Sequence, residues 1–296
     1  MSFQHELLED FPKIYDGIYG LAVGDALGVP YENLTRDSFT CPNMVGFGAH
    51  SQPKGTWSDD TSLTLATLES ISRQSGKINI EDIRLNFEKW FYKNYFTPFG
   101  KVFDCGYTCS TAIIEKKGQN TVDDNGNGSL MRILPLAFVK NISNRQIRKV
   151  SAITHGHRIA KQCCVAYVRI AKDLMKGFSI KKAIKRNLRY IPCKNAKSLI
   201  FHGDRDNIKS GGFVVDTLIA ALWCLCQTDN YRECVLTAVN LGGDTDTTAA
   251  IAGGLAGIVY GIKNIPSKWL ENLKGKQIIE DCIPGIGEKQ DSETLY

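Results

Sequence analysis

Carboxylate and hydroxyl side chains gather in three short segments of this 296-residue chain. The first segment is Gly24–Gly28, followed by Glu32; the second is Gly55–Thr61, and the third is Gly242–Thr248. In the second and third segments a glycine turn comes first, then hydroxyls and carboxylates, then an apolar stretch. This order predicts that both segments place their side-chain oxygens in the first turn of a helix.

Helix capping alone is one interpretation of these segments. Ser58 and Asp244 are favoured N-cap residues, and an aspartate in a first turn suits the helix dipole. However, a cap needs one side-chain oxygen, whereas the second and third segments together offer four carboxylates. Such carboxylates repel one another when they meet, and a cation removes that cost. The combined pattern therefore favours a cation site.

The kind of cation follows from the ligand atoms, which are all oxygen. Hard oxygen donors suit Mg²⁺, Mn²⁺ or Ca²⁺ rather than zinc or copper, and the spacing differs from that of an EF-hand loop. Carboxylates from two helix ends can hold two ions about 3.5–4 Å apart. The candidate ligands are Ser58, Asp59, Asp60, Asp244, Asp246 and Thr247, with Glu32 as a further candidate.

Two other segments contain groups that can bind phosphate. Residues 125–132 are rich in glycine and precede an apolar helix predicted over 133–139, and the backbone N–H groups of such a loop can hold an anion. The loop lacks the Gly-Lys-Ser/Thr of a P-loop, so a plain loop is the alternative. At residues 154–157, either a histidine donates a hydrogen bond to phosphate, or Thr154 caps the next helix and the histidine faces solvent.

Helical periodicity dominates the elements that must position these segments. No linker, repeat or low-complexity segment interrupts the chain, which predicts an all-α fold in one domain over residues 1–296. We expect its core over about residues 14–275 and a frayed end from Gly287 to Tyr296. Apolar residues recur at helical spacing in Phe11–Leu27, Leu63–Ile71, Ile83–Phe91, Met131–Val139, Ala160–Met175, Phe213–Leu225 and Val235–Leu241.

Glycines crowd into two of the expected helices, near opposite ends of the chain. Glycine costs about 1 kcal/mol in a helix interior relative to alanine, and a close helix–helix contact can offset that cost. We therefore expect these two helices to pack tightly, although tolerated glycine is the simpler alternative. The glycines are Gly17, Gly20, Gly24 and Gly28 in one helix, and Gly253, Gly254 and Gly257 in the other.

Composition narrows the class of protein. The formal net charge is +5, without a dense Lys/Arg run beside aromatics, so a nucleic-acid module is not expected, whereas an anionic partner is. Ten cysteines without a CxxC pair indicate buried thiols in a reducing compartment. The first residues do not have the layout of a signal peptide, and the apolar run Thr248–Ile262 is too short to cross a membrane. We expect a cytoplasmic protein.

In their joint order these motifs resemble those of the ADP-ribosylglycohydrolase family, which includes the dinitrogenase reductase-activating glycohydrolase. The resemblance runs from about Ile18 to Gly261. It rests on the three acidic segments together with Asp104-Cys105-Gly106, Gly126–Arg132 and Thr154-His155. The resemblance implies a single orthogonal all-α domain with two Mg²⁺ ions, or Mn²⁺, in a central cleft.

The resemblance also implies roles for individual residues. Glu32 matches a glutamate that gates the metal site in some family members, and Asp104 matches an aspartate near the scissile bond in the arginine-specific ones. Gly212 lies in a segment that matches the adenosine end. The implied metal ligands are Ser58, Asp59 and Asp60 on one side, and Asp244, Asp246 and Thr247 on the other. The implied contacts to the diphosphate and distal ribose are Gly126, Asn127, Gly128, Ser129 and His155. The candidate catalytic residues are Glu32, Asp59, Asp104 and Asp246.

The implied reaction is hydrolysis of the N-glycosidic bond between ADP-ribose and arginine on a modified protein. Breaking the bond at ribose C1 builds positive charge on the sugar, and the basic guanidine must leave protonated. Either Asp104 or Glu32 could be the acid or the base, or both could be structural. The alternatives are another linkage (serine, O-acetyl-ADP-ribose or a nucleobase) and a non-catalytic relative. We expect an ADP-ribosylated protein or a small ADP-ribose conjugate as partner, no membrane, and a monomer.

Overall fold

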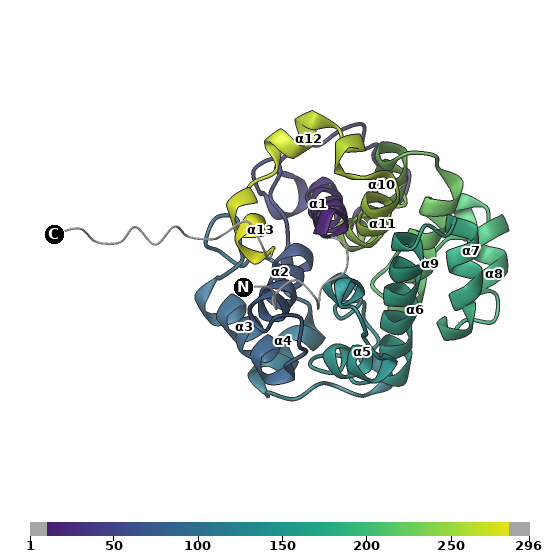
Figure 1. Cartoon of the computed structure of the whole chain (residues 1–296). Coiled ribbons are helices and arrows are strands. Elements are labelled where there is room, and N and C mark those ends of the chain that lie inside the picture. Colours follow the sequence, from purple (N-terminus) through teal and green to yellow (C-terminus); the bar gives the residue numbers. More distant parts are fainter. Residues whose placement is uncertain (1–10, 284–296) are drawn as a thin grey trace.

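A computed structural model describes residues 11–283 and shows an all-helical molecule (Figure 1). The α-helices are α1 Phe11–Gly28, α2 Asp59–Arg73, α3 Ile80–Lys93, α4 Tyr107–Ile114, α5 Asn144–Ser151, α6 Arg158–Met175, α7 Ile180–Asn187, α8 Ala196–His202, α9 Val214–Gln227, α10 Tyr231–Val239, α11 Thr245–Tyr260, α12 Ser267–Asn272 and α13 Lys276–Cys282. The 3₁₀ turns are η1 Val29–Tyr31, η2 Gly48–His50, η3 Val122–Asp124, η4 Leu134–Phe138, η5 Leu188–Tyr190, η6 Arg205–Asn207 and η7 Ile262–Asn264. The prediction of a single all-α domain is confirmed; the expected frayed end falls outside the described residues.

The helix predicted over residues 131–139 is wrong in type and length. The structure has only the 3₁₀ turn η4 there, with Pro135 in its first positions. Pro135 has no N–H to donate to the carbonyl oxygen four residues earlier, and its ring clashes with that carbonyl, so a regular helix that begins at Met131 is broken here. The Nζ atom of buried Lys172 donates to the carbonyl oxygens of Ala137 (3.1 Å) and Val139 (2.8 Å). This lysine takes up backbone acceptors that a longer helix would have used.

The glycine-rich helices α1 and α11 lie side by side in the middle of the molecule (Figure 1). A Cβ atom at Gly24 would overlap the backbone of Ala249, with the carbonyl carbon only 2.7 Å away. A Cβ atom at Gly20 would lie 3.0 Å from the Cα atom of Gly257. The two backbones are therefore in direct contact, which confirms the predicted close packing.

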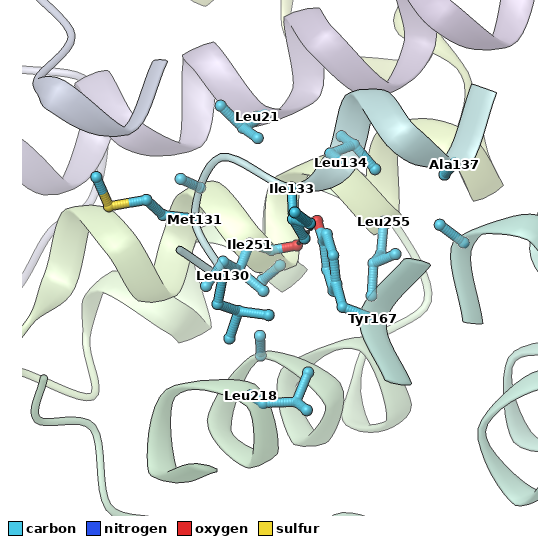
Figure 2. Close-up of a cluster of buried hydrophobic side chains, with 14 of the residues drawn as sticks. Leu21, Leu130, Met131, Ile133, Leu134, Ala137, Tyr167, Leu218, Ile251 and Leu255 are labelled. Carbon is cyan, nitrogen blue, oxygen red and sulfur yellow. Dashed lines mark hydrogen bonds between the residues drawn. The ribbon is translucent and has the colours of Figure 1, made fainter. Parts of the chain in front are cut away.

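The core around this pair is assembled from elements distant in sequence. In Figure 2, Tyr167 of α6 lies among Leu21 of α1, Leu134 of η4 and Leu255 of α11. The Tyr167 hydroxyl donates to the carbonyl oxygen of Ile251 at 3.0 Å, so this buried phenol is satisfied. All ten cysteines are free thiols and most are buried, and no helix of residues 11–283 is long and apolar enough to cross a membrane.

Candidate active site

The first turn of α2 is fixed to α1 by a buried carboxylate. Asp25 of α1 accepts hydrogen bonds from the backbone N–H groups of Ser58 (2.9 Å) and Thr61 (3.0 Å), and from the Thr61 hydroxyl (2.6 Å). These are donors that a helix start leaves free, so Asp25 caps α2 from another helix. Burial raises the pKa of Asp25 to about 6, although these hydrogen bonds act in the opposite direction. Sequence reasoning gave Asp25 no role.

The first turn of α11 is held by the C-terminal end of α1. A Cβ atom at Gly28 would overlap the backbone of Asp246, and it would lie 2.6 Å from the carbonyl carbon of Thr245. The Thr245 hydroxyl donates to the Gly28 carbonyl oxygen at 2.8 Å. Helix α1 therefore brings the two acidic helix starts together.

The predicted metal ligands from the two helices do meet. Carboxylate oxygens of Asp25, Asp60 and Asp246 lie within 4.8 Å of one another. The hydroxyls of Ser58 and Thr247 both donate to Asp60 Oδ2, at 3.0 and 3.3 Å. The structure thus joins residues from the second and third acidic segments, although they are almost two hundred positions apart.

Within residues 11–283, two carboxylate oxygens of the acidic helix starts lack a hydrogen-bond donor. Asp60 Oδ1 and Asp244 Oδ1 are buried and have no hydrogen-bond partner among the described residues. Burial and then the neighbouring carboxylates raise the pKa values of Asp59, Asp60 and Asp246 well above the ordinary range. A buried carboxylate is stable when paired or bound to a metal. The orphaned oxygens and the all-oxygen donor set therefore fit hard divalent cations.

Capping explains only part of the arrangement. The Ser58 hydroxyl does cap α2, accepting from the backbone N–H of Asp60 at 3.3 Å. Asp244 stands at the N-cap position of α11, but its side chain makes no capping hydrogen bond. Instead, Asp244 Oδ2 accepts from the side-chain amide of Asn127 at 2.7 Å. The capping interpretation is thus correct for Ser58 and wrong for Asp244.

Asp59, Asp244 and Thr247 line a cleft of about 210 Å³, together with the glycine-rich loop and His155, whereas Ser58, Asp60 and Asp246 are not among its lining residues. Its lining brings most of the predicted site residues to one place. The lining residues are Glu32, Asp59, Asp104, Gly106, Tyr107, Thr108, Cys109, Gly126, Asn127, Gly128, Met131, His155, Asp244 and Thr247.

His155 lies under the glycine-rich loop and is buried, so the alternative of a solvent-facing histidine is wrong. Burial, followed by the nearby charge of Arg132, lowers the pKa of His155 to about 3. Arg132 donates to the Thr154 hydroxyl (2.7 Å), which in turn is 2.8 Å from His155 Nδ1. Because arginine can only donate, the Thr154 hydrogen is free to bond to Nδ1. In that arrangement the neutral ring carries its proton on Nε2, which lies near Gly126 and Gly128.

The loop needs its glycines for space. A Cβ atom at Gly128 would lie 2.7 Å from the Cys109 sulfur and 2.9 Å from His155 Cε1. The glycines therefore let the loop lie directly against the buried imidazole.

The helix that follows, α6, is capped not by Thr154 but by His157, whose Nδ1 accepts from the Ile159 N–H at 3.3 Å.

Two predicted substrate contacts lie beside the cleft rather than among its lining residues. The Ser129 hydroxyl is fully buried, accepts from the Ser151 hydroxyl at 3.0 Å and lies 3.4 Å from the Cys164 sulfur. Gly212 accepts through its carbonyl oxygen from the Asn127 N–H at 3.0 Å. Both residues support the loop through hydrogen bonds, and their contact with substrate stays a prediction.

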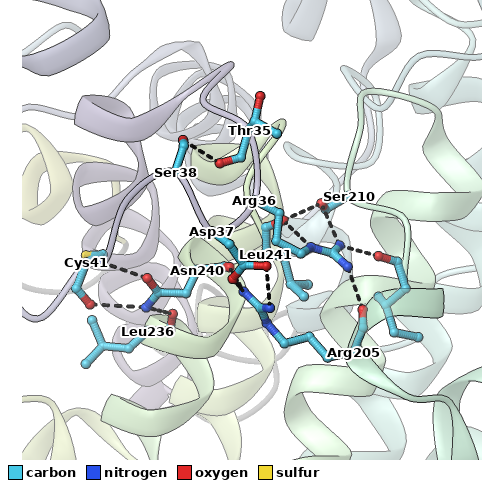
Figure 3. Close-up of polar contacts among 11 residues, drawn as sticks. Thr35, Arg36, Asp37, Ser38, Cys41, Arg205, Ser210, Leu236, Asn240 and Leu241 are labelled. Atoms are coloured by element: carbon cyan, nitrogen blue, oxygen red, sulfur yellow. Dashed lines mark hydrogen bonds and ion pairs between the residues drawn. The ribbon is translucent and has the colours of Figure 1, made fainter.

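A polar network that sequence reasoning missed holds the turn before Asp244 (Figure 3). Arg36 donates to the carbonyl oxygens of Leu241 (2.8 Å) and Arg205 (2.6 Å), and also to that of Ile208. The Asp244 N–H donates to the Ser210 carbonyl oxygen at 2.8 Å. No sequence signal marks Arg36, because all of these acceptors lie more than 160 residues away along the chain.

Two residues that line the cleft, Glu32 and Asp104, meet a histidine. Ligand atoms of Glu32, His50 and Asp104 lie within 4.8 Å of one another, and His50 Nε2 forms an ion pair with Glu32 Oε2. Burial, and then Glu32, raise the pKa of Asp104 to about 6. Sequence reasoning missed His50, because no motif surrounds it.

Comparison with known proteins supports one family. The model of the ADP-ribosylglycohydrolase family matches residues 7–293. The chain is 31% identical to the ADP-ribosylarginine hydrolase Tri1 of Serratia proteamaculans, over 92% of this chain and 78% of that protein. It is 30% identical to the ADP-ribosyl-[dinitrogen reductase] glycohydrolase of Rhodospirillum rubrum, over 90% of this chain and 92% of that protein.

A solved structure described as an ADP-ribosylglycohydrolase-related protein complex has the same fold. It superposes with a TM-score of 0.78 at 28% identity, covering 93% of this chain and 98% of that one. The family match extends over nearly the whole sequence and includes every segment that lines the cleft. The chain therefore belongs to the ADP-ribosylglycohydrolase family and is a hydrolase of that family.

Proposed function

We propose that this protein is a magnesium-dependent hydrolase that removes ADP-ribose from arginine side chains of modified proteins. The observation that carries the proposal is a single cleft lined by residues of both acidic helix starts, by the glycine-rich loop, and by His155 and Asp104. The names of the relatives from Serratia proteamaculans and Rhodospirillum rubrum support the same kind of substrate.

The acidic side of the cleft is suited to hold the two ions. When bound, such ions supply positive charge that orients the ribose hydroxyls and makes a water molecule more acidic. The unpartnered oxygens of Asp60 and Asp244 provide places for them. In this proposal the ligands are Ser58, Asp59, Asp60, Asp244, Asp246 and Thr247.

The opposite side of the cleft is suited to the diphosphate. A neutral His155 that carries its proton on Nε2 offers one hydrogen bond to a phosphate oxygen, without titrating near neutral pH. The glycines at positions 126 and 128 let phosphate approach the loop backbone. The Asn127 side chain joins the two sides, since its amide donates to Asp244. Together these groups would place ribose C1 near the carboxylates.

Asp104 and Glu32 are assigned the proton transfers. With its pKa raised to about 6, Asp104 holds a proton in a larger fraction of molecules near neutral pH than an ordinary aspartate does. Asp104 is therefore the donor to the departing guanidine, and Glu32 on the same cleft wall takes the proton from the attacking water. Asp104 is thus the general acid and Glu32 the general base.

The proposal is tested with three substrates that carry ADP-ribose on arginine, on serine and on a nucleic acid. Purified protein is incubated with each, in Mg²⁺ or in excess chelator, and released ADP-ribose is followed over time. We expect release from the arginine-linked substrate only, and only with Mg²⁺. Release from another linkage would overturn the arginine assignment, and full release in chelator would overturn the metal requirement.

A further inference from the structure

Three separate chain segments bring one imidazole and two carboxylates together beside the cleft. Glu32 directly follows η1, His50 ends η2, and Asp104 lies in the loop before α4. One ligand atom of each lies within 4.8 Å of the other two. This triad is distinct from the cluster of Asp25, Asp60 and Asp246, which contains carboxylates only.

The backbone around His50 is shaped to hold the imidazole in this position. A Cβ atom at Gly48 would overlap Pro30, with its carbonyl carbon 2.7 Å away, so η2 is pressed against η1. Phe47 and Ser51 on either side have φ angles of 65° and 53°. Such conformations cost about 1 kcal/mol or more in non-glycine residues and persist only where the surrounding structure imposes them. His50 is therefore fixed beside Glu32.

The charge of the triad is not balanced by the protein. Among residues 11–283, His50 is the only basic side chain in an ion pair with Glu32, and Asp104 has none. Negative charge remains in excess even when His50 is protonated, which agrees with the raised pKa of Asp104. A divalent cation would supply the missing charge.

The donor atoms of the triad favour a different class of ion from the one that the carboxylate cluster favours. An imidazole nitrogen with two carboxylates suits zinc or another first-row transition metal, whereas Mg²⁺ prefers oxygen alone. Glu32 and Asp104 both line the cleft, whose volume of about 210 Å³ leaves room for water to complete the coordination shell.

We propose that Glu32, His50 and Asp104 form a separate binding site for a transition-metal dication of the zinc class. An ion at this site would occupy the carboxylate oxygens that the proposed hydrolysis needs, so it would inhibit the enzyme. This inhibitory consequence rests on the proposed function, but binding of the metal does not.

The binding experiment compares the wild-type protein with His50→Gln, and uses His202→Gln as the matched control. His202 also ends a helix, but it lies outside the cleft. Zn²⁺ is titrated calorimetrically at saturating Mg²⁺, and Co²⁺ is used as a probe whose visible absorption reports nitrogen ligation. We expect the wild type and His202→Gln to bind one more Zn²⁺ than His50→Gln, or to bind it at least about tenfold more tightly.

Equal stoichiometry and affinity in wild type and His50→Gln, with an unchanged Co²⁺ spectrum, would overturn the proposal and leave His50 as the ion-pair partner of Glu32 only. Circular dichroism and thermal unfolding check the fold, and His50→Asn serves as a second variant if His50→Gln does not fold. A separate assay measures inhibition by Zn²⁺, which we expect to need at least about tenfold more metal in His50→Gln. Because binding is measured without turnover, a failed hydrolase assay does not affect the result.

Discussion

At the scale of single residues, the main feature of this protein is an excess of buried carboxylate over buried positive charge. Asp59, Asp60 and Asp246 are buried, and burial together with mutual repulsion raises their pKa values. Side chains arranged in this way oppose folding unless something compensates them. The divalent cations of the proposed function would supply this compensation.

The first prediction concerns these carboxylates. Asp59→Asn and Asp246→Asn keep the shape of the side chain but remove its charge, so we expect turnover to fall by at least about 100-fold while the fold remains intact. Release of ADP-ribose and circular dichroism are the measurements. Asp216→Asn, an acidic residue in the first turn of α9 outside the cleft, is the control. Full activity in both test variants would contradict the metal mechanism.

At the scale of elements, α1 acts as the scaffold for the site. Its Asp25 caps α2, and its last residue, Gly28, lies against the first turn of α11. The middle of α1 contacts α11 backbone to backbone. A shift of α1 would therefore move both acidic helix starts relative to each other, so the glycines of α1 matter for the geometry of the site as well as for packing.

The second prediction tests this contact with Gly24→Ala. Helix propensity alone would stabilise the variant by about 1 kcal/mol. The added Cβ meets the backbone of Ala249, which cannot move away as a side chain could, so we expect a net loss of about 1–3 kcal/mol in the free energy of unfolding. Denaturant unfolding measures it.

The matched control for this prediction is Gly211→Ala, because a Cβ atom at Gly211 would meet nothing within 4 Å. We expect the control to stay within about 0.5 kcal/mol of the wild type, as surface substitutions usually do. If Gly24→Ala were as stable as the control, the direct backbone contact between α1 and α11 would be wrong.

At the scale of the whole molecule, the acidic site links folding to pH and, in the proposed function, to metal. A carboxyl whose pKa is raised on folding binds protons more readily in the folded state than in the unfolded state. Stability without metal must therefore fall as pH rises from the unfolded pKa, about 4, through the folded value. Asp25 and Asp104, both raised to about 6, place part of this loss between pH 4 and 6.

The third prediction follows from this linkage. Metal binding needs deprotonated carboxylates, so the stabilisation by Mg²⁺ should increase with pH. We expect the difference in melting temperature between Mg²⁺ and chelator to be small near pH 5 and to grow up to pH 8. Thermal unfolding in both conditions across this range measures the difference. A difference that does not change with pH would contradict the link between the acidic cluster and the metal.

The sequence by itself determined the helical class, the close packing of two glycine-rich helices, and the residue types of the acidic site. Each of these is encoded in a local pattern: the period of apolar residues, the spacing of glycines, or the side chains that follow a turn. One local prediction is wrong because of Pro135: a helix was predicted over residues 131–139, and the structure has only the short turn η4 there.

Only the tertiary structure decided which groups meet. Asp25 and Ser58 are 33 positions apart, Glu32 and His50 are 18 apart, and the acceptors of Arg36 are more than 160 residues away. Hydrogen bonding and burial depend on distance in space, and no local pattern records which distant atoms face each other. The capping role of Asp25, the neutral state of His155 and the triad with His50 all arise from such contacts.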